Sequence, residues 1–172
     1  MLKPGDKIPM ELGGEAEVTQ LLGQGGQGAV YRASYRGRDH ALKMYFPNKL
    51  RDPELFRENL QRLCEEGSGD PAFLMPRLLT ERTPDGFGYL MELIPPGYVP
   101  FTDILNARAK FSELYSVANA AIRITAALRE LHNSGRSYQD LNDSGFFLRP
   151  TDGSVLICDC DNLAPYGEHL GI

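Results

Sequence analysis

The 172-residue chain is predicted to adopt an α+β fold, with a β-rich first part that carries one helix and a mostly helical second part. Three observations carry this prediction. Apolar and polar residues alternate in short runs over the first third of the chain, as expected for half-buried strands. A proline-bearing stretch at residues 95–100 then interrupts the pattern. Beyond it, apolar residues recur at helical spacing over Ser112–His132.

The β-rich part is expected to contain five strands and one helix. The helix spans Pro53–Glu66, because Asp52 is a suitable N-cap and Pro53 suits the first helical position. The strands are predicted at residues 15–23, 29–35, 40–46, 73–81 and 87–94, with a turn at 83–86 between the last two. Residues 94–100, with the sequence IPPGYVP, are not expected to form regular structure.

The second part is expected to be built on one long helix that is mostly buried. Its apolar positions are Leu114, Val117, Ala121, Ile124, Leu128 and Leu131. The sequence NSG ends the helix. Two short strands follow at residues 145–148 and 155–158, and the turn RPTDGS joins them into a small hairpin.

The composition excludes several classes of protein. The chain has 18 basic and 23 acidic residues, and without a dense basic cluster it is not expected to be primarily a nucleic-acid binder. Its apolar runs fall short of the roughly 18 residues of a membrane span, and its first residues lack an apolar signal core. Three cysteines, an odd number, do not make a disulfide framework. We therefore expect a reduced, cytoplasmic protein.

Two of the cysteines, Cys158 and Cys160, occur in the sequence C-D-C-D, which invites comparison with a metal site. Their spacing places both on one face of a strand, and a second Cys or His pair that would complete a tetrahedral zinc site is missing from the sequence. We therefore reject zinc binding, and we interpret His132 and His169 as surface or capping residues.

A glycine-rich segment, Gly23–Gly28, satisfies the spacing G-x-G-x-x-G. A dinucleotide-binding fingerprint needs a helix directly after the glycines, whereas a strand follows here, so the glycines lie at the tip of a β-hairpin. Such a tip is either a plain flexible turn or a place where backbone N–H groups approach phosphates. Lys43 follows fifteen residues later in an apolar strand, where a lysine ordinarily faces solvent.

Together, G-x-G-x-x-G-x-V and A-x-K resemble the protein kinases, in which a strand lysine binds the nucleotide phosphates. The resemblance becomes strong in LHNSGRSYQDLNDSGFFL and VLICDCDN, which are similar to the catalytic loop and to the strand that leads into the D-F-G motif. It implies that Lys43 and Asp140 are catalytic, with Asp140 as the base that orients the substrate hydroxyl, and that Asp159 binds Mg²⁺. The chain looks like a bacterial member of the eukaryotic-like Ser/Thr kinases.

The resemblance also implies a set of nucleotide-binding residues. Met91 would lie at the back of the adenine pocket, and the backbone groups after it would meet the edge of the purine. The full set is Leu22, Gly23, Gln24, Gly25, Gly26, Gln27, Gly28, Val30, Ala41, Lys43, Met91, Glu92, Leu93, Ile94, Leu148 and Asp159.

Several positions depart from the family's pattern around the catalytic aspartate. Gln139 replaces the arginine that normally precedes it, so switching through a phosphorylated activation loop should be weak or absent. Tyr138 replaces the histidine before that, and Cys160 replaces the D-F-G phenylalanine. A larger Tyr138 beside a smaller Cys160 is expected to preserve the packed volume.

Further departures affect the groups that would contact phosphate and metal. Asn142 replaces the usual lysine, which weakens one contact to the γ-phosphate, and Gly145 replaces the metal-binding asparagine. Either the second metal is missing, or Asp161 or Asp143 supplies a ligand. Asp161 is favoured, because it lies two residues from Asp159 and close to the path of the phosphates.

The helix at 53–66 raises the question of which residue is the partner of Lys43, because kinases place a glutamate there. On a helical wheel Asn59 lies at the edge of the apolar face, whereas Glu58 faces away from it. The wheel favours Asn59, a neutral hydrogen-bond partner, and Glu58 remains the alternative if the helix is rotated.

The resemblance divides the chain into a kinase N-lobe at residues 1–94, a hinge at 95–100 and a partial C-lobe at 101–172. It implies phosphoryl transfer from ATP, with Mg²⁺, to Ser/Thr hydroxyls of proteins. One alternative is a pseudokinase that binds nucleotide as a regulatory module, and a weaker one is a scaffold without nucleotide. Because the family's later motifs are missing, we expect a fragment that self-associates through exposed C-lobe surface, with no nucleic-acid or membrane partner.

Overall fold

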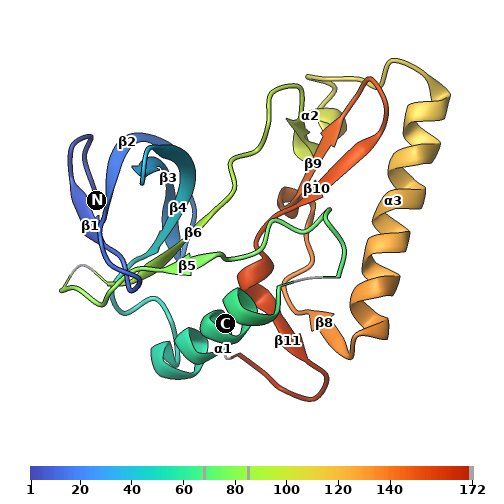
Figure 1. The fold of residues 1–172 in the computed structure, drawn as a ribbon. Coiled ribbons are helices and arrows are strands. Elements are labelled where there is room, and N and C mark those ends of the chain that lie inside the picture. The colour runs from blue at the N-terminus through green and yellow to red at the C-terminus, as the bar shows by residue number, and fades with distance from the viewer. Residues whose placement is uncertain (68, 85, 171–172) are drawn as a thin grey trace. The chain divides into compact units, whose positions relative to one another are not determined.

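The chain folds into two compact units, which are described separately below (Figure 1). The computed structural model describes residues 1–67, 69–84 and 86–170. The first unit consists of Met1–Gly67 and Pro76–Leu93, together with Leu170. The second unit consists of Ile94–His169, together with residues 69–75.

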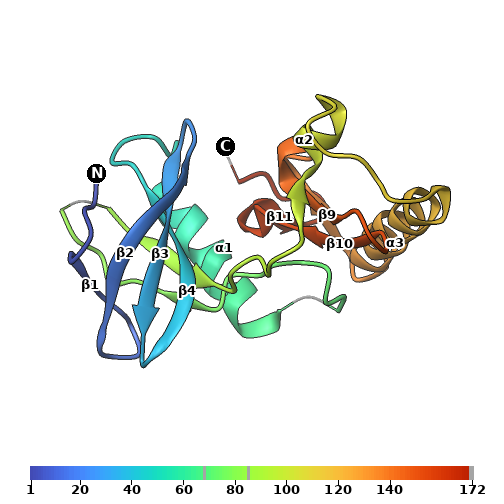
Figure 2. The same ribbon diagram turned by 90° about the horizontal axis from the view of Figure 1, so that it is seen from above.

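The first unit is a curled antiparallel sheet of six strands with the order β1-β2-β3-β4-β6-β5 (Figures 1 and 2). The strands are β1 (Lys7–Pro9), β2 (Glu15–Gln24), β3 (Gly28–Tyr35), β4 (Arg38–Tyr45), β5 (Leu78–Leu79) and β6 (Gly88–Met91). The sequence predicted all of these strands except β1, but of the predicted strand at residues 73–81 only Leu78–Leu79 forms β5. One face of the sheet encloses a core cluster of Ile8, Met10, Ala16, Val18, Ala29, Tyr31, Ala33, Tyr35, Leu42, Met44 and Leu90.

Strand β2 is irregular where it approaches the glycine-rich segment. β1 pairs with Glu15–Glu17, whereas β3 pairs along the whole length from Glu17 to Gln24. The register of the β2–β3 pair shifts twice, between Val18 and Gln20 and again between Leu21 and Gly23. Such bulges increase the local twist of a strand.

Helix α1 (Pro53–Glu66) begins and ends where the sequence predicts. The Asp52 side chain accepts a hydrogen bond from the backbone N–H of Leu55 at 3.0 Å, and Pro53 occupies the first helical turn. The buried face of the helix consists of Phe56, Asn59, Leu60 and Leu63. The Phe56 ring packs edge-on against Tyr45 with 5.1 Å between ring centroids, which fixes the helix against β4.

The second unit combines one long helix with two small antiparallel sheets, β10-β9-β7 and β11-β8. Its elements are β7 (Val99–Pro100), α2 (Phe101–Leu105), α3 (Leu114–Asn133), β8 (Arg136–Tyr138), the 3₁₀ helix η1 (Asp143–Gly145), β9 (Phe146–Arg149), β10 (Ser154–Ile157), the 3₁₀ helix η2 (Cys160–Asn162) and β11 (Leu163–Pro165). The predicted long helix and the hairpin of β9 and β10 are confirmed.

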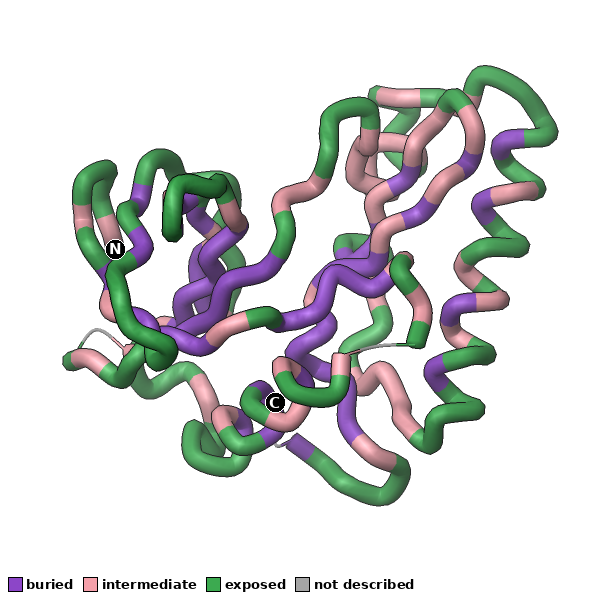
Figure 3. The backbone as a smooth tube through the Cα atoms, viewed as in Figure 1, coloured by how far each residue is buried: buried purple, intermediate pink, exposed green. Residues whose placement is uncertain are grey.

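The prediction that the long helix is mostly buried is wrong. Its buried residues are Ser116, Ala120, Ala127 and Leu131, and Figure 3 shows that most of α3 is exposed or intermediate. The face turned inward carries small side chains because the helix backbone lies very close to the β9–β10 turn. A Cβ atom added at Gly153 would lie 2.1 Å from the carbonyl oxygen of Ser116, so large residues have no room there.

The prediction that residues 94–100 lack regular structure is wrong at their end. Val99 and Pro100 form β7 and pair with Leu148 and Phe147 of β9. A proline is tolerated here because β7 is a two-residue strand at the edge of its sheet. Asp85 of the predicted turn, and the last two residues of the predicted C-lobe segment 101–172, lie outside the described residues.

Candidate functional site

The glycine-rich segment forms the tip of the β2–β3 hairpin, as predicted. The N–H of Gly25 donates to the carbonyl of Gly28 at 2.9 Å, which closes the tip. Gly28 must be glycine, because an added Cβ would lie 2.2 Å from the carbonyl oxygen of Met44. At Gly23, Gly25 and Gly26, no heavy atom of the described residues lies within 4 Å of an added Cβ, and φ is not positive. The fold itself therefore leaves these three glycines unexplained.

Several predicted nucleotide-binding residues lie on one face of the sheet, opposite the core cluster. Val30 pairs directly across from Lys43, and Ala41 pairs across from Met91. Since residues two apart in a strand share a face, Ala41 and Lys43 lie side by side. Lys43 is 8% exposed, and its Nζ lies 5.6 Å from the centroid of the Tyr45 ring, so the lysine predicted to be functional is largely buried.

Helix α1 turns Asn59 inward and Glu58 outward. Asn59 is 2% exposed, whereas Glu58 is exposed. The Arg62 guanidinium donates to the Asn59 side-chain oxygen at 2.7 Å. This orientation agrees with the helical wheel, and the identity of the residue that pairs with Lys43 stays a prediction.

The remaining predicted nucleotide-binding residues are divided between the two units. In the first unit Leu22 is exposed and Glu92 is exposed beside Arg77, with 3.5 Å between their charged groups, while Leu93 is half-buried. In the second unit Ile94 is half-buried, and Leu148 is buried in β9.

The predicted catalytic base, Asp140, is exposed in the loop that follows β8. The Asn142 side chain makes hydrogen bonds to the backbone of this loop. Its side-chain amide donates to the carbonyl of Asp140 at 2.9 Å, and its side-chain oxygen accepts from the N–H of Ser144 at 3.0 Å, which caps η1. At the position where kinases place a lysine, this chain therefore has a side chain that holds the loop backbone.

The predicted metal ligand, Asp159, follows β10 in the left-handed backbone conformation, with φ 53° and ψ 36°. This conformation costs a non-glycine residue about 1–2 kcal/mol. Such strain accumulates at functional sites. Asp159 is partly exposed, whereas Asp161, the other predicted metal ligand, is completely buried. Of the two carboxylates, Asp159 is the one that is open to solvent.

Two backbone hydrogen bonds and one from the Tyr138 side chain bring together the segments that carry Asp140 and Asp159. The N–H of Cys158 donates to the carbonyl of Gly145 at 2.7 Å, and the Tyr138 hydroxyl donates to the carbonyl of Cys158 at 2.5 Å. A third bond runs from the N–H of Gln139 to the carbonyl of Asn162 at 3.0 Å. The backbone segments that carry Asp140 and Asp159 are therefore joined by hydrogen bonds.

Burial raises the pKa of the Tyr138 hydroxyl well above its ordinary value, and the nearby Cys160 and Asp159 add to this. The sequence predicted the proximity of Tyr138 and Cys160 but missed a second neighbour. A Cβ added at Gly145 would lie 3.0 Å from the Tyr138 hydroxyl oxygen. In this loop Tyr138 is larger and Gly145 is smaller than the residue of the kinase pattern, and this pair of opposite size changes was the signal that could have revealed the contact.

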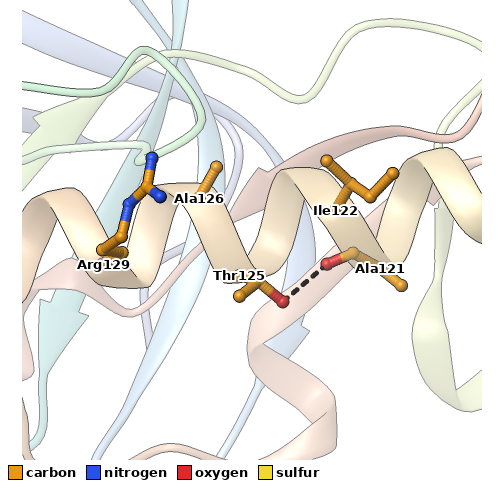
Figure 4. Close-up of a pocket in the computed structure, with 5 residues that line it drawn as sticks. All are labelled: Ala121, Ile122, Thr125, Ala126 and Arg129. Carbon is orange, nitrogen blue, oxygen red and sulfur yellow. Dashed lines mark hydrogen bonds between the residues drawn. The ribbon is translucent and has the colours of Figure 1, made fainter.

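A hollow of about 380 Å³ lies on the outer side of α3, away from these residues in sequence. It is lined by Ala121, Ile122, Thr125, Ala126 and Arg129, all from the same helix (Figure 4). The Thr125 hydroxyl donates to the carbonyl of Ala121 at 2.8 Å, so the helix itself takes up its hydrogen-bonding capacity. None of the predicted site residues lies in this hollow.

Solved structures of protein kinases share this fold. The PknI kinase domain of Mycobacterium tuberculosis is 19% identical, with a TM-score of 0.69 over 95% of this chain and 64% of that domain. A second crystal structure of the PknI domain is 20% identical, with a TM-score of 0.70 over 94% of this chain and 62% of that one. Vaccinia related kinase 3 is 17% identical, with a TM-score of 0.71 over 96% of this chain and 53% of that one.

These likenesses confirm the predicted α+β fold of the protein-kinase kind. The chain spans less than two thirds of the PknI domain and about half of vaccinia related kinase 3. It matches no protein-family model and no curated protein sequence. Among the described residues, α3 and the other helices are too short or too polar to cross a membrane.

Proposed function

We propose that this chain binds ATP with Mg²⁺ and transfers its γ-phosphoryl group to Ser/Thr hydroxyls of proteins. The observation that carries the proposal is the pair of hydrogen bonds that tie Cys158, next to Asp159, to both ends of the loop that holds Asp140. Phosphoryl transfer depends mainly on positioning and on electrostatic stabilisation. A framework that holds together the two segments bearing Asp140 and Asp159 would serve that requirement.

The first unit supports the nucleotide part of the proposal. Gly23, Gly25 and Gly26 are not required by the fold, and without side chains at the hairpin tip they would let phosphates approach the backbone closely. Lys43 lies on the same sheet face as Val30 and contributes a positive charge for the phosphates.

The second unit supports the chemical part. Asp159 would be one ligand of the metal, because this residue is partly exposed and lies between two buried residues. The described residues contain no group of three Asp, Glu, His or Cys side chains that could hold an ion, so phosphate oxygens would have to complete the site. Mg²⁺, when bound there, would neutralise the charge of the phosphates. Asp140 would accept the proton of the substrate hydroxyl and direct its oxygen at the phosphorus.

The proposal is tested by transfer of labelled phosphate from ATP to a mixture of Ser/Thr-containing proteins. We expect incorporation that requires Mg²⁺ and that falls by about 10²–10⁴-fold in Asp140→Asn, the range for loss of a general base. Asp39→Asn, which changes an exposed aspartate outside the proposed site, is the matched control. Incorporation that survives undiminished in Asp140→Asn would contradict the proposal.

A pseudokinase is the second candidate, and a specific observation favours it. Gly145 has no side chain with which to bind a metal, and the Asn142 side chain is used within the loop. A rise in the melting temperature with ATP and Mg²⁺, without any phosphate transfer, would identify this function. A melting temperature that ATP leaves unchanged would instead favour a scaffold.

A further inference from the structure

Both backbone polar groups of Cys158 are bound by the catalytic-loop segment. Its N–H donates to the carbonyl of Gly145, which closes the C-terminal end of η1, and its carbonyl accepts from the Tyr138 hydroxyl, at the end of β8. Cys158 is 8% exposed and directly precedes Asp159. The two ends of the segment 138–145 therefore both hydrogen-bond to Cys158, the residue directly before Asp159.

The two ends of this segment also fit each other. The Tyr138 hydroxyl that bonds to Cys158 lies beside Gly145, where an added Cβ would lie 3.0 Å from the Tyr138 oxygen. Such a contact is tighter than about nine in ten real Cβ contacts. The next nearest atom, the carbonyl oxygen of Cys158, would lie at a comfortable 3.8 Å. Gly145 has no positive φ, so the tyrosine hydroxyl, rather than the backbone conformation, accounts for glycine at this position.

We propose that Tyr138 and Gly145 form a matched pair, in which the Tyr138 hydroxyl is a positioning group that holds the Asp140 loop against the Asp159 segment and Gly145 provides the space for it. The glycine at 145 is therefore a consequence of the tyrosine at 138, and the two changes are not independent losses. The effect on phosphoryl transfer rests on the proposed function, whereas the pairing itself does not.

A double-mutant cycle on thermal stability tests the pairing. The four proteins are the unaltered chain, Tyr138→Phe, Gly145→Ala and the double variant. We expect Tyr138→Phe to lower the melting temperature by about 2–8 °C, because the buried Cys158 carbonyl loses a donor. Gly145→Ala should lower it in the presence of the tyrosine hydroxyl and leave it nearly unchanged in the Tyr138→Phe background.

Two controls make the cycle specific. Tyr166→Phe removes the hydroxyl of an exposed tyrosine and should leave the melting temperature unchanged. Tyr138→Ala removes both ring and hydroxyl, and Gly145→Ala should be tolerated in that background as well. If Gly145→Ala costs the same with and without the Tyr138 hydroxyl, the pairing is overturned.

A kinetic measurement tests the positioning role. Tyr138→Phe should lower kcat for phosphate transfer by about tenfold, one power of ten per 1.4 kcal/mol of lost positioning, with KM for ATP changed less than twofold. If kcat is unchanged in Tyr138→Phe while the double-mutant cycle is non-additive, the positioning role of Tyr138 is overturned and its pairing with Gly145 is supported. If the unaltered chain transfers no phosphate, the proposed function fails, and the melting temperatures still decide whether the pair exists.

Discussion

The two units of this chain are stabilised in different ways. The first is a continuous sheet whose strands and helix enclose large apolar side chains, among them Phe56, Leu42 and Tyr89. The second has two small sheets, a helix with small inward residues and many hydrogen bonds between loops. Where apolar packing dominates, the sequence keeps the kinase pattern of glycines and lysine. Where hydrogen bonds dominate, it departs from that pattern at 138, 139, 142 and 145.

This difference indicates that residues which depart from the kinase pattern can still contribute to the structure of the loop. Asn142 and Tyr138 each make hydrogen bonds that hold the loop, so their substitutions maintain the framework by other means. A sheet core cannot make such exchanges as easily, because a change in side-chain volume disturbs all its neighbours. Substitutions in the two units can test this difference.

Phe56→Ala should have the largest effect, because it removes a 1% exposed ring from the core of the first unit. We expect a loss of about 3–5 kcal/mol in the free energy of unfolding. Chemical denaturation followed by circular dichroism measures it. Leu55→Ala, on the exposed side of the same helix, is the control and should cost far less. Equal losses would mean that packing does not dominate this unit.

Gly28→Ala should cost about 1–3 kcal/mol, because its new methyl group would collide with the backbone of Met44. Gly26→Ala, in the same hairpin, has open space and should leave the free energy of unfolding unchanged or slightly improved. Titration with ATP measures the affinity of each variant. Gly26→Ala is expected to weaken ATP binding without loss of stability. If Gly26→Ala binds ATP as well as the unaltered chain, the hairpin is a plain turn.

Asp152→Asn should have a smaller effect, and one that depends on pH. The Arg149 guanidinium, 2.7 Å away, and the N–H of Ser154 hold the pKa of the Asp152 carboxyl below its usual range. A lowered pKa stabilises the fold above the ordinary value of about 3.9, and this contribution is lost as the pH falls. The stability difference between the two proteins should therefore shrink between about pH 5 and pH 2.

Arg149→Gln provides the second arm of that experiment. It removes the largest cause of the shift and should reproduce the pH dependence of Asp152→Asn. A stability difference that persists unchanged into acid would show that the charge of Asp152 is irrelevant to the second unit.

Ile122→Gln should have the smallest effect. This residue is 67% exposed on α3, so the free energy of unfolding should change by less than about 0.5 kcal/mol. Leu131→Ala, on the buried side of the same helix, should cost about 2–5 kcal/mol. If Ile122→Gln proved as costly as Leu131→Ala, the outer face of α3 would also be stabilised by packing, which would contradict this difference between the units.

The elements predicted best are those with strong local signals. The strands from β2 to β4 follow from alternation, and the bounds of α1 follow from its aspartate cap and its proline. Helix α3 was located correctly but its buried face was not, because large apolar residues were weighted above Ser116 and Ala120. Gly153 lies so close to the backbone of α3 at Ser116 that small residues face it. A contact between residues so far apart in the sequence has no local signature.

The site shows the same division. Lys43, Asp140 and Asp159 could be proposed from the sequence, because each belongs to a recurrent motif. The sequence could not reveal that Tyr138 reaches Cys158 across Gly145, because this contact depends on a three-dimensional path between strands. Short elements such as β1, α2 and β11 were missed for a related reason: two to five residues carry too little periodicity to be recognised.

The irregular outer half of β2 has a consequence for how the protein behaves at high concentration. Leu21 and Leu22 are nearly half exposed on a stretch whose far edge β1 does not cover. A flat strand of this kind would recruit strands from neighbouring molecules and seed aggregation. The two register shifts twist the stretch out of plane, and the glycines after it carry no side chains to reinforce a foreign strand. The register shifts therefore make the outer half of β2 a poor template for strand pairing between molecules.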